Sequence, residues 1–225
     1  MFLIEEQWVR KYEEYNAYWR HDGNPKRPHA LLTSGAKHSN GYFNSELVME
    51  DSNLLDMACA DLVQKLIDQG LNILDVDRVV GPAMGAITLA DGVARHIGKR
   101  RDLACLRGYT EKVESKDGTV HCFIRTALRK REWILFVEDV ITTGGSIESA
   151  AAGSQIAVME VFVMPFVGSL VNRSGKTDLN GKKIVGLIDK PMPTWIADDC
   201  PLCAQDSIPI RPKGIENWAA LNASY

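Results

Sequence analysis

The chain has 225 residues, which is enough to bury one full hydrophobic core, and we expect a single domain with a small added subdomain. A formal net charge of -3 and a pI near 6.0 give no electrostatic reason to expect a nucleic acid or a membrane surface as partner. No signal-peptide pattern opens the chain and no apolar stretch is long enough to cross a bilayer, so we expect a cytoplasmic protein.

Apolar periodicity and turn signals in the first half of the chain predict alternating helices and strands. An amphipathic spacing predicts a helix over residues 3–19, and a second apolar stripe predicts a helix over residues 52–69. Residues 78–81 are expected to form a short strand, followed by a helix over residues 86–97 and a strand over residues 103–106. Strands that alternate with helices of this length favour a parallel sheet with helices on both faces.

The second half of the chain continues this alternation. An apolar run predicts a buried strand over residues 134–137, and the helix after it is expected to start near Ile147. A further strand is expected within residues 161–171. The Asn-Gly pair at residues 180–181 predicts a turn into a strand over residues 183–188, which would form a hairpin edge or join a small subdomain with the amino-terminal segments.

Two adjacent carboxylates, Glu138 and Asp139, and a small polar loop follow the buried strand. At the carboxyl end of a strand and the amino end of a helix, free N–H groups, hydroxyl groups and the helix dipole favour a phosphate. The two carboxylates would repel a bare phosphate, so we expect them to bind hydroxyl groups or a metal carried by the ligand, which indicates a phosphorylated sugar. The expected phosphate-binding residues are Thr142, Thr143, Gly144, Gly145 and Ser146.

The stretch from Val137 to Ser146 resembles the phosphoribosyl pyrophosphate (PRPP) loop of type I phosphoribosyltransferases. The resemblance implies that Glu138 and Asp139 hold the ribose hydroxyls, that the following loop holds the 5'-phosphate, and that Asp139 takes part in catalysis. A Walker-type phosphate loop is a poorer match, because it needs a lysine directly before the hydroxyl residue and Gly145 stands there.

Residues 33–44 resemble the loop with which orotate phosphoribosyltransferases cover the base. The matching residues are Ser34, Gly35, Ser39, Tyr42 and Phe43. A flat heterocycle stacks well on an aromatic face, so the resemblance implies that Tyr42 or Phe43 covers the base. Many family members carry a lysine where this chain has Thr33.

Two further segments resemble the parts of the family that bind pyrophosphate. Residues 81–86 resemble the pyrophosphate loop, which implies contacts from Met84 and Gly85, although bacterial orotate enzymes often have a lysine around Gly85. The polar segment 110–122 carries the Thr-Glu-Lys sequence of one orotate subgroup and is expected to be a hairpin or loop. The resemblance implies that Lys112 is catalytic and contacts pyrophosphate, and that this loop lies near the neighbouring active site of a homodimer.

Residues 171–174 resemble the Asp-Arg pair of the orotate enzymes, in which the arginine binds the carboxylate of the base. Planar, bidentate pairing is what a carboxylate-bearing base requires, and Arg173 is placed to supply it. Asn172 stands where the family usually has aspartate. The expected base-binding residues are therefore Tyr42, Phe43, Thr142 and Arg173.

Cys200 and Cys203 have the spacing of half a zinc site. No second cysteine pair is visible in the sequence, so we expect a reduced pair in a carboxyl-terminal turn, with a zinc site as the alternative. The metal that the resemblance implies is Mg²⁺, held mainly by PRPP, with no protein side chain as a direct ligand.

The sequence as a whole is similar to that of the type I phosphoribosyltransferases, closest to the orotate enzymes. This implies an α/β fold, a parallel sheet flanked by helices, with a hood formed by about residues 1–50 and 175–225 on a core of about residues 51–174. The implied reaction joins PRPP and orotate to give orotidine 5'-monophosphate and pyrophosphate. Three alternatives stay open: a purine-type transferase that does not need Arg173, a PRPP-binding regulator, and a structural subunit that binds ribose phosphate.

Overall fold

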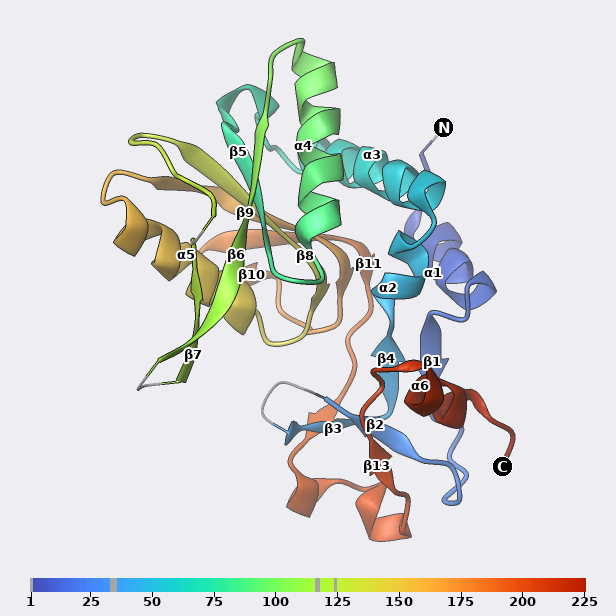
Figure 1. The fold of residues 1–225 in the computed structure, drawn as a ribbon. Helices are drawn as coiled ribbons and strands as arrows, with labels where there is room; N and C mark the ends of the chain where they lie inside the picture. The colour runs from blue at the N-terminus through green and yellow to red at the C-terminus, as the bar shows by residue number, and fades with distance from the viewer. Residues whose placement is uncertain (1, 33–35, 116–117, 124) are drawn as a thin grey trace.

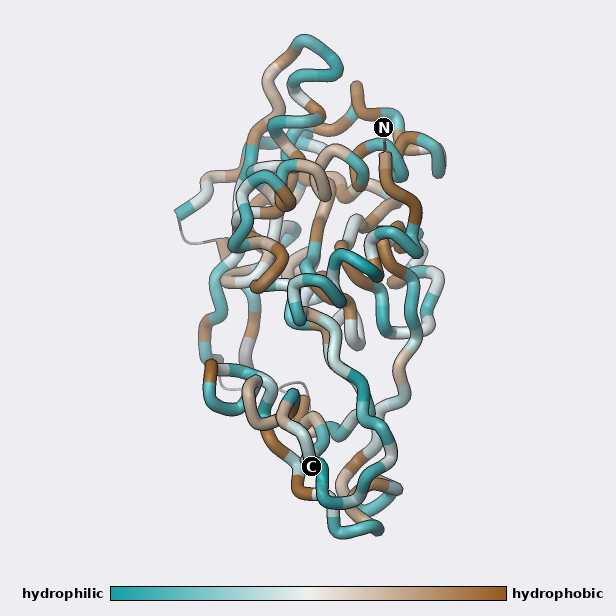
Figure 2. The backbone as a smooth tube through the Cα atoms, turned by 90° about the vertical axis from the view of Figure 1, so that its right-hand side faces the viewer, coloured by the Kyte–Doolittle hydropathy of each residue, from teal (hydrophilic) through white to brown (hydrophobic). Residues whose placement is uncertain are grey.

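The computed structural model describes residues 2–32, 36–115, 118–123 and 125–225. Thr33, Ser34 and Gly35, which the resemblance places in the base-covering loop, lie outside these ranges. The chain forms a large α/β part with a smaller hood below it (Figure 1). Figure 2 shows the two parts from the side, joined by extended segments, with the carboxyl terminus in the hood. No helix within the described ranges is long and apolar enough to cross a membrane.

A seven-stranded sheet forms the centre of the large part, in the order β10-β11-β9-β8-β5-β6-β7. Its inner strands run parallel, and an antiparallel strand lies at each edge. The expected parallel sheet is therefore confirmed. The strands are β5 (Arg78–Pro82), β6 (Leu106–Ser115), β7 (Gly118–Cys122), β8 (Trp133–Ile141), β9 (Phe162–Asn172), β10 (Asp178–Leu179) and β11 (Lys182–Asp189).

Alternate residues of the central strands face opposite helical layers, because side chains along a strand alternate between its two faces. Leu135 and Val137 of β8 pack in one apolar cluster with α1, α3 and α4, whereas Ile134 and Phe136 pack in a second cluster with α5. Both faces are covered, so β8 is apolar along its whole buried length. The helices of this part are α1 (Glu5–Glu14), α2 (Ser45–Met49), α3 (Ser52–Asp68), α4 (Ile87–Arg101) and α5 (Gly145–Ala157), with a 3-10 turn η2 (Ile73–Asp75).

The hood contains a four-stranded sheet, β12-β3-β2-β13, and a two-stranded ribbon, β1-β4. Its apolar cluster is small, with the buried members Trp19, Ala30, Leu32, Trp218 and Leu221. The indole of Trp19 donates a hydrogen bond to the carbonyl of Leu221 at 2.8 Å, which ties the ribbon to the last helix. The elements are β1 (Tyr18–Arg20), β2 (His29–Leu31), β3 (His38–Ser39), β4 (Gly41–Phe43), β12 (Thr194–Trp195), β13 (Pro209–Ile210), α6 (Ile215–Asn222), and the 3-10 turns η3 (Ala197–Asp199) and η4 (Cys203–Gln205).

The boundary between hood and core differs from the expected hood of about residues 1–50 and 175–225. α1 packs on the core, where Trp8 is buried and its indole donates to the Asp61 carboxylate of α3 at 2.9 Å. β10 and β11 form a hairpin at the edge of the large sheet, turning at residues 180–181, which both have positive φ. The hairpin edge is confirmed, but it belongs to the core, and the hood consists of β1 to β4, β12, β13, η3, η4 and α6.

Candidate functional site

A cleft of about 1220 Å³ opens between the large sheet and the hood. Its floor is made by the loops that follow β5 and β8, at the carboxyl ends of parallel strands, where open α/β sheets bind their ligands. The hood contributes β4 and α6 to the opposite wall. This volume lies slightly above the range of about 300 to 1,000 Å³ that is usual for pockets that bind a small molecule.

The loop between β8 and α5 presents backbone N–H groups to the cleft. α5 begins at Gly145, two residues before the expected start at Ile147. The nitrogen of Glu148 donates to the Gly144 carbonyl, so the N–H groups of Ser146 and Ile147 precede the helical ladder and can bind an anion. The expected phosphate-binding residues all line the cleft: Thr142, Thr143, Gly144, Gly145 and Ser146.

Gly144 fixes the shape of this loop, because its φ of 88° lies in the left-handed region. A Cβ atom at this position would also lie 2.3 Å from Cδ2 of Leu179 in β10. The Lys176 ammonium donates to the carbonyl of Thr143 at 3.0 Å and holds the loop from the same side. Leu179 of the edge hairpin therefore packs against the loop between β8 and α5, and this packing favours glycine at position 144.

The acid pair Glu138 and Asp139 lies inside β8, which extends to Ile141, rather than after the strand as expected. Both residues line the cleft. Burial and then the negative charge of Asp139 raise the pKa of Glu138 well above its usual range, while the positive charge of Lys112 acts in the opposite direction. A ligand that brings hydroxyl donors or a cation would relieve this repulsion, so the pair suits sugar hydroxyls or a metal ion.

The loop after β5 approaches the acid pair closely at Gly85. A Cβ atom there would lie 3.1 Å from Oδ2 of Asp139, a contact tight enough to press on the carboxylate. The departure from the lysine of many orotate enzymes thus leaves room for Asp139 in its present position. Met84, 83% exposed, lies beside Gly85 at the rim of the cleft, so both expected pyrophosphate contacts are at the site.

Lys112 lies on β6 opposite His121 of β7, so the expected hairpin is present in the structure. Its side chain is exposed and lines the cleft of its own chain. The Lys112 charge lowers the pKa of Glu138, against the larger effects of burial and Asp139. A contact with the neighbouring subunit of a dimer stays a prediction.

The two expected stacking residues have different positions. Phe43 lines the cleft but is only 2% exposed, because its ring stacks on Tyr18 at 4.5 Å and meets Tyr12 edge-on at 5.3 Å, and its contact with a base stays a prediction. Tyr42 is half-buried at the cleft wall, with Trp218 of α6 at 5.8 Å. Sequence reasoning missed Trp218, which also lines the cleft, because a lone aromatic in a short terminal helix forms no motif.

Arg173 lines the cleft from the end of β9 and is 2% exposed. Its guanidinium donates to the Gly41 carbonyl at 3.0 Å and to Ser39 Oγ at 2.6 Å, both in the hood. Its Nε has no hydrogen-bond partner within the described part of the chain. Burial lowers the pKa of Arg173 to about 10. A buried cation without a carboxylate partner is costly, and an anionic ligand would compensate it.

Asn172, which stands where the family usually has aspartate, does not orient Arg173. Its amide donates to the Lys176 carbonyl at 3.0 Å and to the Asp189 carboxylate at 3.1 Å. The side-chain oxygen accepts from the Ser174 hydroxyl at 2.7 Å. Asn172 therefore stabilises the turn after β9, while the hood holds the guanidinium.

Known proteins share the sequence pattern of this chain. Residues 49–160 match the family described as the phosphoribosyl transferase domain. The chain is 36% identical over 187 residues to the orotate phosphoribosyltransferase of Caldicellulosiruptor bescii, which covers 83% of this chain and 88% of that relative. It is also 36% identical over 185 residues to the orotate phosphoribosyltransferase of Desulforamulus reducens, covering 82% of this chain and 87% of that relative.

Solved structures share the fold. The orotate phosphoribosyltransferase from Aeropyrum pernix superposes with a TM-score of 0.59 at 21% identity, covering 80% of this chain and 92% of that chain. The adenine phosphoribosyltransferase from Saccharomyces cerevisiae superposes with a TM-score of 0.54 at 12% identity, covering 81% of this chain and 99% of that chain. The same architecture thus occurs in enzymes named for different bases.

The support of the phosphate loop by β10 predicts that Gly144→Ala destabilises the protein. The left-handed φ costs alanine about 1–2 kcal/mol, and overpacking against Leu179 adds about 1–3 kcal/mol. Gly181→Ala is the matched control, because Gly181 has a φ of 78° and no atom within 4 Å of the added methyl group. Urea unfolding measures both, and an equal loss of stability in the two variants would contradict the packing argument.

Proposed function

The chain belongs to the phosphoribosyltransferase family, and from this premise we propose that it transfers the phosphoribosyl group of PRPP to orotate. The observation that carries the choice of base is Arg173, a buried guanidinium at the cleft with an unpartnered Nε and two hood acceptors that are uncharged. Orotate brings a carboxylate to this cation, whereas uracil and the purines do not. The names of the sequence relatives support the same assignment.

The polar groups that line the cleft support one placement of PRPP. Its 5'-phosphate would bind at the amino end of α5, where the N–H groups of Ser146 and Ile147 and the helix dipole favour an anion. The ribose hydroxyls would then donate to Glu138 and Asp139, which relieves the repulsion between the two acids. The pyrophosphate would extend over the loop that contains Gly85.

The residues present also fit Mg²⁺, for which we propose a place between PRPP and the acid pair. Glu138 and Asp139 carry the oxygen atoms that Mg²⁺ prefers, and a cation would favour the charged form of Glu138, whose pKa is raised by burial and then by the negative charge of Asp139. Mg²⁺ would be held mainly by the diphosphate oxygens, as the sequence analysis expects. When bound, it neutralises charge on the pyrophosphate leaving group.

Catalysis would rest on orientation and electrostatics. Lys112 donates to the pyrophosphate as its charge grows, and the acid pair favours the positive charge that develops on the ribose ring. Tyr42 and Trp218 close the side of the cleft and exclude water from the cationic ring. Arg173 fixes the base with its nucleophilic nitrogen toward the ribose, which converts a bimolecular reaction into one within a single complex.

We keep a homodimer and a cytoplasmic location as further predictions of this assignment. In such a dimer, the β6-β7 hairpin of one subunit would lie near the active site of the neighbouring subunit. Sedimentation of the purified protein measures the oligomeric state directly.

Asp139→Asn should lower kcat/KM for PRPP, because a neutral amide oxygen accepts a hydrogen bond from a ribose hydroxyl less strongly than a charged carboxylate does. Loss of one hydrogen bond to a charged group costs about 1.5–3 kcal/mol, or roughly a ten- to hundredfold fall in kcat/KM for PRPP. Glu160→Gln, an exposed acid far from the cleft lining, is the control. Unchanged PRPP kinetics in Asp139→Asn would refute the role of the acid pair.

Lys112→Ala should lower kcat by roughly a hundred- to a thousandfold, the size seen when one donor to a transition-state charge is removed. The KM for orotate should change little, since Lys112 meets the leaving group rather than the base. Lys130→Ala provides the comparison, because Lys130 is exposed and lies outside the cleft lining. A loss that is confined to KM for the base would count against catalysis by Lys112.

Arg173→Ala should lower the ratio of kcat/KM for orotate to that for uracil. Removing one partner of a buried, charged contact costs about 2–5 kcal/mol, which is at least a tenfold change in this ratio. Arg173→Lys keeps the charge but loses the planar guanidinium, so it should keep only part of the preference for orotate over uracil. This variant also tests whether the hood keeps its structure without the guanidinium. If both variants keep the wild-type ratio, a purine-type transferase or a PRPP-binding regulator becomes the better reading.

A further inference from the structure

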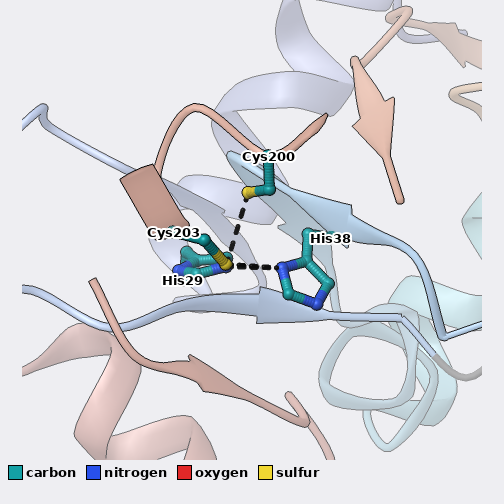
Figure 3. A group of neighbouring side chains, drawn as sticks. All are labelled: His29, His38, Cys200 and Cys203. Atoms are coloured by element: carbon teal, nitrogen blue, oxygen red, sulfur yellow. Dashed lines mark hydrogen bonds between the residues drawn. The ribbon is translucent and has the colours of Figure 1, made fainter. Parts of the chain in front are cut away.

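Four side chains with metal-binding atoms converge in the hood, away from the cleft lining. They are His29 of β2, His38 of β3, Cys200 directly after η3 and Cys203 at the start of η4. Their ligand atoms all lie within 4.8 Å of one another. Figure 3 shows the histidines coming from two neighbouring strands near the amino terminus and the cysteines from the carboxyl-terminal segment above them.

Four of the distances among these atoms are close to the edge lengths of a zinc tetrahedron. His29 Nε2 lies 2.9 Å from His38 Nδ1, and Cys203 Sγ lies 3.2 Å from the same nitrogen. His29 Nε2 is 3.7 Å from Cys200 Sγ and 3.6 Å from Cys203 Sγ. A tetrahedral zinc ion with bonds of about 2.0 Å to nitrogen and about 2.3 Å to sulfur needs edges of roughly 3.3–3.8 Å. An ion would need only a small outward movement of the two imidazoles.

A second layer of hydrogen bonds orients His29 toward the centre of the cluster. The Ser207 hydroxyl donates to the Arg27 carbonyl at 2.6 Å, so its oxygen accepts from His29 Nδ1 at 2.9 Å. This assigns the proton to Nδ1 and leaves the lone pair of Nε2 facing both sulfurs and His38. Metal-binding histidines are commonly held in this way by an outer partner.

The hood also has a structural need for such a link. Its apolar cluster has only a few buried members, and the turns η3 and η4 contain no buried residue of their own. The segment from η3 to β13 nevertheless has a defined course, with β13 pairing to β2 and Cys200 buried at 2% exposure. Small domains with little core commonly use a structural metal for this purpose.

We propose that His29, His38, Cys200 and Cys203 bind a Zn²⁺ ion that fastens the carboxyl-terminal segment to the β2-β3 hairpin. Four protein ligands of the Cys₂His₂ type complete a tetrahedral shell, so the site is structural and leaves no position for a substrate. The cysteines are free thiols, which agrees with the expected reduced pair and supplies the thiolate ligands. This site is the zinc alternative that the sequence analysis keeps for Cys200 and Cys203, and it is separate from the Mg²⁺ expected with PRPP.

The position of the ion gives it a role in the shape of the cleft. His38 is followed by Ser39, whose hydroxyl oxygen accepts from Arg173 and whose proton goes to the carbonyl of Pro193. β3 thus contributes His38 to the metal cluster, while its next residue, Ser39, binds the guanidinium of Arg173 at the cleft. Loss of zinc would loosen the hood before it affects the sheet.

The first test is the metal content of the full-length protein purified without chelator. We expect about one zinc ion per chain in the wild type and less than about a tenth of that in Cys200→Ser/Cys203→Ser, since two ligands are removed. Cys105→Ser is the matched control, because Cys105 lies before β6 and outside the cluster, and it should keep the wild-type content. Equal zinc content in the double variant and the wild type would overturn the proposal.

A second measurement does not depend on whether the double variant folds. Co²⁺ added to metal-free wild-type protein should give the intense visible absorption of a tetrahedral ion together with thiolate charge-transfer bands, and Zn²⁺ should abolish both. Weak absorption typical of an octahedral ion, or no spectral change, would overturn the proposal. So would a disulfide between Cys200 and Cys203 in the freshly purified protein, since it would leave no thiolate ligands.

Discussion

The Arg173 guanidinium joins the two parts of the molecule on which the cleft depends. Arg173 directly follows β9 of the large sheet, and its guanidinium donates to Gly41 and Ser39 in the hood. This one group therefore links the two walls of the cleft and supplies a buried positive charge. Its Nε remains unpartnered among the described residues. This arrangement is unfavourable without an anion, and the cleft is therefore organised to receive one beside the hood.

The charges at the cleft are divided between its two ends. Glu138 and Asp139 form an adjacent acid pair at the sheet, where burial and then the charge of Asp139 raise the pKa of Glu138, while Arg173 places positive charge near the hood and the amino end of α5 favours a phosphate. A complementary ligand has hydroxyl groups that face Glu138 and Asp139, one anion that faces the amino end of α5 and another anion that faces Arg173. A ribose phosphate next to a carboxylate-bearing base has that order, which is why site geometry and family membership lead to one proposal.

Features carried by short, continuous segments could be predicted from the sequence. The apolar strand, the acid pair and the loop of small residues follow one another directly, so Thr142 to Ser146 line the cleft as expected. The edge hairpin was likewise visible, since residues 180–181 combine two residue types that accept positive φ. Local sequence patterns could not predict which sheet contains β11, because this depends on its pairing with β9.

Features that depend on long-range contacts could not be predicted in this way. Packing of Phe43 against Tyr12 and Tyr18 leaves little of its ring exposed at the cleft, which its local sequence does not show. Zinc stayed an alternative in the sequence analysis because no second ligand pair was visible there, and the structure brings His29 and His38 to the two cysteines, with His29 171 positions before Cys200. No spacing rule reaches across such a separation, and the pairings of β13 with β2 and of β12 with β3 bring the two segments together.

Pyrophosphate release by the wild-type protein tests the central claim most directly. The assay combines PRPP and Mg²⁺ with orotate, uracil, adenine or hypoxanthine and compares the specificity constants. The account predicts that orotate exceeds every uncharged base by at least about a hundredfold, which corresponds to roughly 2.7 kcal/mol of recognition by the buried guanidinium. Equal use of uracil, a preference for a purine, or no release with any base would contradict it.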